Sequence, residues 1–219
     1  MISRTIQLLP VTLCLSIPAF SSAEEPKLSK EEKDAGFELL FNGRDLTGWE
    51  HNGKPGTFEA KDGILAGIHR KDAAYWLSTI EQFGDFELRL EYKIPPKGNS
   101  GVFIRAPRDG RTSQKGMEIQ IYDEPAKTEP GKGSTGAIYN VVPARKFAHR
   151  PAGEWNAIWI LCEGDRVKVT INGETVNDAR MSEHEALKDR PRNGYIGLSA
   201  HTDVVEFRNV RLRKIGTNQ

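Results

Sequence analysis

The chain has 219 residues, with 31 Lys and Arg against 30 Asp and Glu, and 37% of its residues are hydrophobic. This balance of charge provides no large basic field, which argues against a nucleic-acid partner and against binding to an anionic membrane surface. The length is sufficient for one well-buried domain.

The first 23 residues predict a secretory signal peptide. Arg4 gives a cationic start, residues 6–20 are apolar, and residues 21–23 form a small-residue cleavage site. The apolar run is short and contains two prolines, so we expect no membrane insertion. We therefore expect export to the periplasm or the extracellular space after cleavage near Ala23.

A charged segment follows at residues 24–35, and it predicts a tether or a short helix. Ser29 followed by Glu32 fits a capping box. Removal of the predicted signal leaves Cys162 as the single cysteine, so we expect no intrachain disulfide. Because Cys162 ends an apolar run, we interpret it as a buried structural thiol.

Residues 36–215 predict one domain of short strands separated by turns. Apolar and polar residues alternate most clearly in 86–94, which indicates a half-buried antiparallel strand. Residues 124–136 indicate a loop, and Ser182 with Glu185 suggests a cap for a short helix. Such a pattern favours an all-β antiparallel β-sandwich. The predicted strands are 37–41, 58–60, 64–67, 75–79, 86–94, 102–105, 117–123, 137–142, 155–162, 167–171, 195–200 and 204–213.

The central stretch, residues 98–124, predicts two strands joined by a polar loop. In 117–123 three apolar residues alternate with Glu118, Gln120 and Tyr122, so one face is core and the other is polar. If the two strands pair, Phe103 and Arg105 join that polar face. A solvated outer face is the plain alternative. The mixture of aromatic and polar residues, with a Gly-rich turn at the rim, favours a sugar-binding face.

Several motifs together resemble one known family. They are GFELLFNGRDLTGW at 36–49, GNSGVFIR at 98–105, MEIQIYD at 117–123, GEWN at 153–156 and EFRNVRLR at 206–213. The family was first catalogued as a domain of unknown function and later described as 3-keto-disaccharide hydrolase or 3-keto-glucoside lyase/hydratase. The resemblance implies a concanavalin A-like jelly roll with a concave ligand groove. It also implies cleavage of 3-keto-glycosides by removal of the C2 proton, elimination of the C1 substituent and hydration.

The resemblance also suggests catalytic residues. His201 matches the family motif LQDHG, whereas Ser199, Ala200 and Thr202 depart from it, so any role of the usual Gln and Asp is absent or supplied elsewhere. We assign Glu118 or His201 as the base. The enolate would be stabilised by Arg105 or by a metal ion.

Other residues are candidates for binding substrate or metal. Aromatic residues belong to the core by default, and Trp49 and Tyr139 are the better sugar-stacking candidates among them because they lie beside turn or loop sequence. No cofactor is certain, and a divalent metal would take its ligands from Glu118, His201 and Asp123, although their spacing does not identify a site. The complete set of substrate-binding candidates is Asn99, Gln120, Tyr122, Tyr139, Trp49 and Asp123.

Two rival functions remain at this point. A non-catalytic carbohydrate-binding module would use the same fold and the same aromatic residues. An ordinary glucanase is the weaker rival. Glu118 and Asp123 form E-x-Q-x-x-D where laminarinase-type glucanases have E-x-D-x-x-E, and five residues along a regular strand reverse the direction of the side chain. The sequence leaves the aglycone, the anomer and the oligomeric state open.

Overall fold

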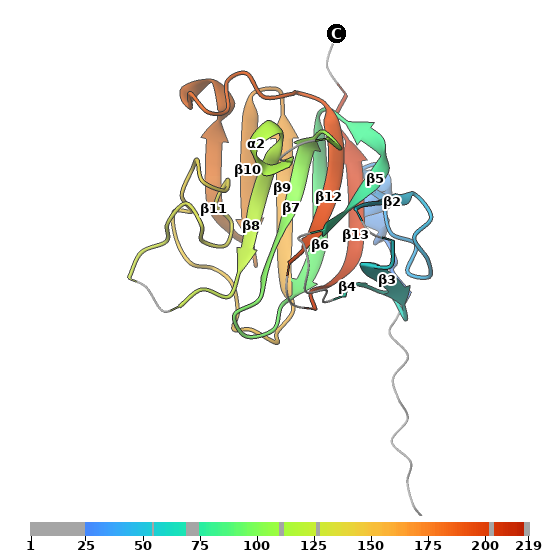
Figure 1. Ribbon diagram of the computed structural model, residues 1–219. Helices are drawn as coiled ribbons and strands as arrows, with labels where there is room; N and C mark the ends of the chain where they lie inside the picture. The colour runs from blue at the N-terminus through green and yellow to red at the C-terminus, as the bar shows by residue number, and fades with distance from the viewer. Residues whose placement is uncertain are drawn as a thin grey trace, which may run out of the picture.

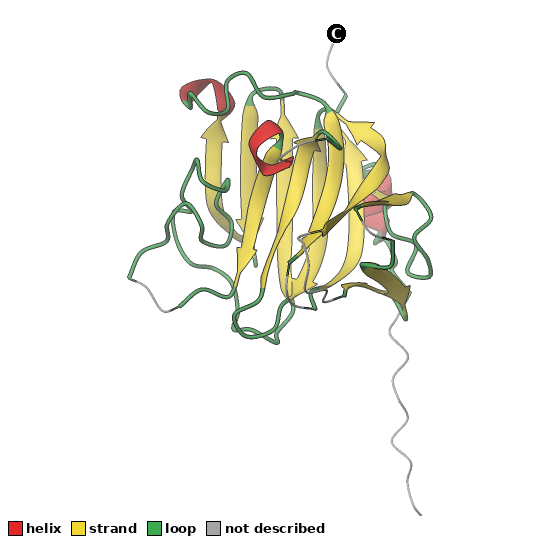
Figure 2. Cartoon of the chain, viewed as in Figure 1, coloured by secondary structure: helices red, strands yellow, loops and turns green. Residues whose placement is uncertain are grey.

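The computed structural model describes residues 25–53, 55–68, 75–109, 112–125, 128–201 and 204–216. Within them, two antiparallel sheets pack face to face as a β-sandwich (Figure 1), and most of the chain is strand or loop (Figure 2). The all-β prediction is therefore confirmed. The proposed signal peptide lies outside the described residues. No helix in the described part of the chain is long and apolar enough to cross a bilayer.

The smaller sheet lies in front in Figure 1 and the larger sheet behind it. The smaller sheet contains β2 (Trp49–Asn52), β5 (Tyr75–Phe83), β7 (Asn99–Ala106), β8 (Met117–Tyr122) and β12 (Gly194–Ala200). Its strand order is β2-β5-β12-β7-β8. Strands that are distant in the sequence are therefore neighbours, because β12 is inserted between β5 and β7.

The larger sheet is formed by strands from both ends of the chain. They are β1 (Glu38–Leu39), β3 (Phe58–Lys61), β4 (Ile64–Gly67), β6 (Phe86–Lys93), β9 (Asn156–Glu163), β10 (Arg166–Ile171), β11 (Glu174–Arg180) and β13 (Glu206–Lys214). The order is β11-β10-β9-β6-β13-β4-β3, and β1 also pairs with β13.

The core lies between the sheets and follows from the alternation of side chains along each strand. In β6 every second residue is buried, as the sequence pattern predicted. Leu88 and Ile160 from the larger sheet belong to the same buried cluster as Ile104 and Ile119 from the smaller sheet. Cys162 is a free buried thiol within this cluster, which confirms its structural interpretation. Its pKa is raised by burial to about 12, so it stays protonated.

Three short helices complete the described structure. Helix α1 (Lys30–Asp34) begins with the predicted capping box, in which Ser29 and Glu32 bond to each other's backbone N–H. Helix α2 (Thr112–Lys115) lies in the loop between β7 and β8, where the sequence indicated no helix. The sequence suggested a short helix capped by Ser182, whereas the structure has a 3-10 helix that spans Met181–Glu183 and includes Ser182.

The predicted strand at 137–142 is wrong. That segment is a folded loop, and Ile138 forms isolated bridges to Ile119 and Val142. Gly136 and Asn140 have positive φ angles of 86° and 61°, which turn the chain at two places and prevent an extended strand. The apolar run in this loop packs against the edge strand β8 rather than extending the sheet.

Candidate functional site

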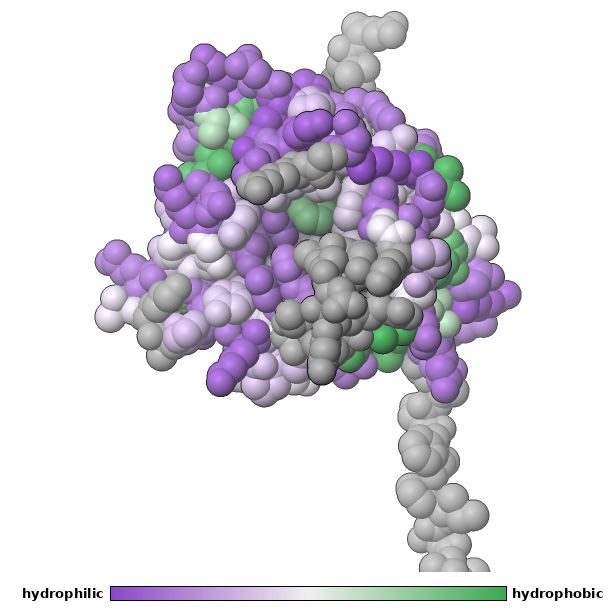
Figure 3. All heavy atoms as spheres, viewed as in Figure 1, coloured by the Kyte–Doolittle hydropathy of each residue, from purple (hydrophilic) through white to green (hydrophobic). Residues whose placement is uncertain are grey.

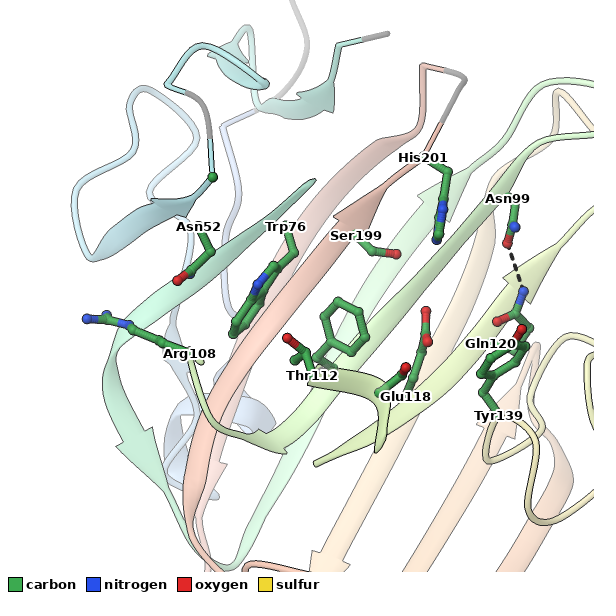
Figure 4. A pocket seen from close by; sticks show the side chains of 13 residues that line it. Asn52, Trp76, Asn99, Arg108, Thr112, Glu118, Gln120, Tyr139, Ser199 and His201 are labelled. Carbon is green, nitrogen blue, oxygen red and sulfur yellow. Dashed lines mark hydrogen bonds between the residues drawn. The ribbon is translucent and has the colours of Figure 1, made fainter. Parts of the chain in front are cut away.

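A pocket of about 620 Å³ opens on the outer face of the smaller sheet (Figure 4). Figure 3 shows this face, where mostly hydrophilic side chains surround a recessed hydrophobic area. The volume is within the range of about 300–1,000 Å³ that is common for small-molecule sites. The described lining residues are Asn52, Gly53, Trp76, Asn99, Phe103, Arg108, Thr112, Ser113, Glu118, Gln120, Tyr139, Ser199 and His201.

Cross-strand pairing explains why residues from different strands of the smaller sheet meet in this pocket. Gly197 of β12 lies opposite Phe103 of β7, which in turn lies opposite Glu118 of β8. In the adjacent row, Trp76 of β5 lies opposite Ser199. Because side chains of directly opposed residues point to the same face, each row places its members on the pocket floor.

Two glycines leave room for the larger side chains of the floor. A Cβ atom at Gly101 would lie 2.5 Å from Glu118 Oε1, so the carboxylate occupies the space above this glycine. A Cβ atom at Gly197 would lie 2.1 Å from Trp76 Cε3. Substitution of either glycine by a larger residue would therefore displace a pocket side chain.

Glu118 is a buried carboxyl group that has no charged partner among the described residues. Its side chain is only 6% exposed, and within the described structure its carboxylate makes no hydrogen bond. Burial raises the pKa of Glu118 to about 7, because the charged form loses its hydration without gaining a compensating contact. Near neutral pH the group is therefore present in both protonation states, which suits a general base.

His201 follows the last residue of β12 and faces Glu118 across the pocket. Figure 4 shows its ring pointing from the end of β12 into the space above Glu118. Burial lowers the pKa of His201, so its neutral form is favoured. The two catalytic candidates that the sequence suggested on β8 and after β12 are thus brought together.

Three of the suggested sugar binders also line the pocket. Gln120 Nε2 donates a hydrogen bond of 2.8 Å to Asn99 Oδ1, so the two amides fix each other's orientation (Figure 4). Tyr139 reaches the pocket from the loop that follows β8, and its backbone N–H donates to the carbonyl of Glu118. These groups offer hydrogen-bond donors and acceptors beside the carboxyl group.

In the opposite half of the pocket the sequence placed Phe103 on the polar face but did not find Trp76 or Arg108. Trp76 and Phe103 form an edge-to-face aromatic pair with ring centroids 5.3 Å apart. Arg108 lies over the ring of Tyr195 and pairs with Glu50, which holds its guanidinium at the pocket rim. The sequence predicted a strand at 75–79, but only the strand order shows that Trp76 lies on the pocket face.

Arg105 does not lie beside Glu118, which corrects the expectation that it stabilises an enolate there. Its φ angle is +47°, and this irregularity turns the side chain away from the pocket face. The guanidinium is fully buried and donates to the carbonyls of Gly84 and Gly164 and to the carboxylate of Asp85, at 2.8, 2.9 and 2.8 Å. Arg105 is a structural anchor between loops.

Three other candidates also lie elsewhere. Trp49 is 6% exposed in the core, and its Nε1 donates to the carbonyl of Leu40, so it is not a sugar-stacking residue. Asp123 accepts a hydrogen bond of 2.7 Å from the backbone N–H of Lys97 and does not line the pocket. Tyr122, the last residue of β8, lies opposite Asn99 but is also absent from the described lining.

The metal hypothesis gains no structural support from the described residues. Glu118 and His201 both face the pocket, but no group of three or more His, Cys, Asp or Glu side chains comes together in the described ranges. Asp123, the third suggested ligand, instead accepts a hydrogen bond from the backbone N–H of Lys97. These two ligands alone do not complete a coordination shell of the usual kind.

The sandwich fold and a pocket of aromatic, amide and carboxyl groups define a carbohydrate-active jelly-roll protein. More particularly, the chain belongs to the family of the 3-keto-alpha-glucoside-1,2-lyase-like domain, whose model matches residues 36–213. A 3-keto-disaccharide hydrolase of Bacteroides thetaiotaomicron is 24% identical over 243 residues, covering 89% of this chain and 84% of the relative.

Solved structures show the same fold. A candidate glycosyl hydrolase from Parabacteroides distasonis superposes with a TM-score of 0.76 at 24% identity, covering 88% of this chain and 100% of that chain. The carbohydrate-binding module CBM66 from Bacillus subtilis gives a TM-score of 0.56 at 19% identity, covering 78% of this chain and 98% of that chain. The jelly-roll expectation is therefore confirmed.

Proposed function

We propose that the protein cleaves 3-keto-glycosides by elimination followed by hydration. A ketone at C3 acidifies the hydrogen on C2. A base takes that proton, the C2–H electron pair forms an enolate, and the enolate expels the substituent at C1 as a C1–C2 double bond forms. Water then adds its oxygen to C1 and returns a proton to C2, so the sum of the two steps is hydrolysis.

The buried carboxyl group of Glu118 carries this proposal. A carboxylate with its ordinary pKa is a weak base, whereas burial raises the pKa of Glu118 to about 7 and matches it to proton abstraction near neutral pH. Its backbone is held in β8, and its carboxylate lies in the space above Gly101. The proton acceptor is thus held in one place above the pocket floor.

The remaining pocket residues supply positioning and a hydrogen-bond donor for the leaving group. His201 faces Glu118, and its neutral ring would donate a hydrogen bond to the departing C1 oxygen. Asn99, Gln120 and Tyr139 would bind sugar hydroxyl groups. The aromatic pair at the opposite end would contact the apolar faces of the sugar.

The pocket argues against an ordinary retaining glucanase. Such an enzyme needs two carboxyl groups about 5–5.5 Å apart. Among the described lining residues Glu118 is the single carboxylate. Asp123 lies outside the pocket and accepts a hydrogen bond from the backbone N–H of Lys97. Elimination from a keto sugar needs one carboxylate only, because the ketone supplies the activation.

The direct test is incubation of the pure protein with 3-keto-trehalose or a 3-keto-glucoside, with detection of the released aglycone. A substrate deuterated at C2 is expected to react several times more slowly, since the C2–H bond breaks during the reaction. Absence of release, with and without added divalent metal, would refute the proposal. Release without any isotope effect would point to direct hydrolysis.

The likeness to CBM66 supports a second candidate, a non-catalytic carbohydrate-binding module. A binder would use the aromatic and amide groups of the pocket but would not depend on Glu118 as a base. Glycan binding that survives both Glu118→Gln and His201→Ala, together with no turnover by the wild type, would favour this candidate.

We also propose that the protein is exported. The support is the sequence of residues 1–23, with its cationic start, apolar run and small-residue cleavage site. N-terminal sequencing of the secreted protein is expected to begin near Glu24. A mature chain that keeps residues 1–23 would contradict export by this route.

A further inference from the structure

Ser199 is a pocket residue whose hydroxyl group has no structural task. The side chain is 2% exposed, and its Oγ is buried without a hydrogen-bond partner in the described structure. A buried hydroxyl group in this state is unfavourable, because it has lost its hydrogen bond to water. Its neighbour Ser100 differs, since Ser100 Oγ donates a hydrogen bond of 2.7 Å to the carbonyl of Ser199.

The sheet places Ser199 close to the carboxylate of Glu118. Leu198 of β12 pairs with Val102 of β7, so the next position, Ser199, lies beside Gly101. The space above Gly101 is occupied by the Glu118 carboxylate. Neighbouring strands are only about 4.8 Å apart. Figure 4 shows the Ser199 hydroxyl pointing toward the space between Glu118 and His201.

This arrangement fits the chemistry of a proton next to a ketone. The acidic hydrogen is on C2 and the ketone oxygen is on the adjacent carbon C3, so a base and a hydrogen-bond donor must flank the two carbons at short separation. As C2 loses its proton to Glu118, the electron pair moves toward the C3 oxygen. A donor aimed at that oxygen stabilises the enolate more than the ketone.

We infer that the Ser199 hydroxyl donates a hydrogen bond to the C3 oxygen of the substrate and to the enolate formed from it. The inference rests on the proposed function and assigns the role that Arg105 does not fill. Ser199 retains its proton throughout. Gln120 is less suited, because its Nε2 already donates to Asn99. The C3 oxygen of the substrate would thus be the hydrogen-bond partner that the Ser199 hydroxyl lacks in the described structure.

Replacement of Ser199 by Ala tests the inference through kinetics. We expect kcat for a 3-keto-glucoside to fall about a hundredfold, the loss typical of one oxyanion donor, with KM changed much less. The midpoint of the pH profile should stay in place, because Ser199 makes no bond to Glu118. The melting temperature should not fall, because no hydrogen bond within the described structure is lost.

Ser100→Ala is the matched control, because it removes a buried hydroxyl one strand away that bonds to backbone. We expect it to lower stability and to leave kcat of the folded protein within about threefold, because the Ser100 side chain does not line the pocket. Equal losses in the two variants, or a shifted pH midpoint in Ser199→Ala, would overturn the assignment.

A spectroscopic measurement tests the hydrogen bond without turnover. The probe is 1,5-anhydro-3-keto-glucitol labelled with ¹³C at C3, which has the ketone but no leaving group. Its bound carbonyl stretch is expected at lower frequency in the wild type than in Ser199→Ala. The same frequency in both proteins, or no binding at all, would overturn the inference. A shifted carbonyl with no cleavage of 3-keto-glycosides would refute the proposed function and leave the Ser199 assignment standing.

Discussion

Two buried charged groups on neighbouring strands have opposite surroundings. Arg105 of β7 is fully enclosed, and its guanidinium bonds to two carbonyls and to the carboxylate of Asp85. Glu118 of β8 is almost as deeply buried but bonds to nothing in the described structure, and its pKa is raised to about 7. Loss of one partner from a fully bonded buried charge destabilises a fold, whereas a buried charge without partners is expected at a site of chemistry.

The largest expected effect is the loss of stability on removing Arg105. Arg105→Ala would leave Asp85 and two loop carbonyls without their partner, and we expect a loss of about 3–5 kcal/mol in the free energy of unfolding. Denaturant unfolding measures this loss. The folded fraction should keep its KM, because Arg105 does not line the pocket.

Arg166→Ala is the control, since Arg166 also pairs with an aspartate, Asp178, but in a more exposed position. Its removal should change stability by at most about 1 kcal/mol. Similar losses in the two variants would contradict the view that burial of Arg105 makes it an anchor.

Glu118→Gln should lower activity rather than stability, the reverse of what is expected for Arg105→Ala. The substitution is nearly isosteric and removes the proposed base, so we expect kcat to fall at least about a hundredfold while stability does not decrease. Glu87→Gln is the control, because Glu87 pairs with Arg89 and Arg213 on the outer face of the larger sheet. It should leave kcat unchanged. Full turnover by Glu118→Gln would show that the outer face of β8 is not catalytic.

The pH dependence of stability should distinguish the wild type from Glu118→Gln. The pKa of Glu118 is raised from 4.5 to about 7 in the folded protein, so between these values the native state holds a proton that the unfolded state has released. The stabilisation that protonated Glu118 contributes is therefore fully present below pH 4.5 and is lost as pH rises through 7. We expect the wild type to lose about 3 kcal/mol relative to the variant over this interval.

Unfolding curves of both proteins between pH 4.5 and 8 measure this difference. The rate of cleavage should change in the other direction, rising with pH to a plateau as Glu118 ionises, with a midpoint near the same pKa of about 7. Parallel stability curves for the two proteins would show that Glu118 has an ordinary pKa and is hydrated.

The smallest effect is expected from Gly101→Ala. The added Cβ would lie 2.5 Å from Glu118 Oε1, so the carboxylate must move while β7 and β8 keep their pairing. We expect kcat/KM to fall about tenfold, since a small displacement of a reacting group is sufficient for such a loss. Gly133→Ala, where a Cβ meets nothing within 4 Å, is the control and should be neutral.

Much of the fold could be predicted because each strand carries its own alternating pattern, as β6 shows most clearly. The same pattern placed Glu118 and Gln120 on one face. Arg105 was misplaced because one residue with positive φ breaks the alternation, and this is invisible in the sequence. Trp76 was missed because the insertion of β12 between β5 and β7 is a long-range choice that no local pattern reports.

The position of β13 in the larger sheet has a consequence for how the chain acquires its structure. This strand, Glu206–Lys214, is inserted between β6 and β4, and it also holds β1. During synthesis β4 and β6 are made long before β13, the strand that pairs with both of them. Their edges facing β13 therefore stay unpaired until β13 has been made. Such non-local closure is slow and exposes strand edges to aggregation. A nascent chain is therefore expected to remain sensitive to protease until β13 has emerged, and to become resistant in one cooperative step afterwards.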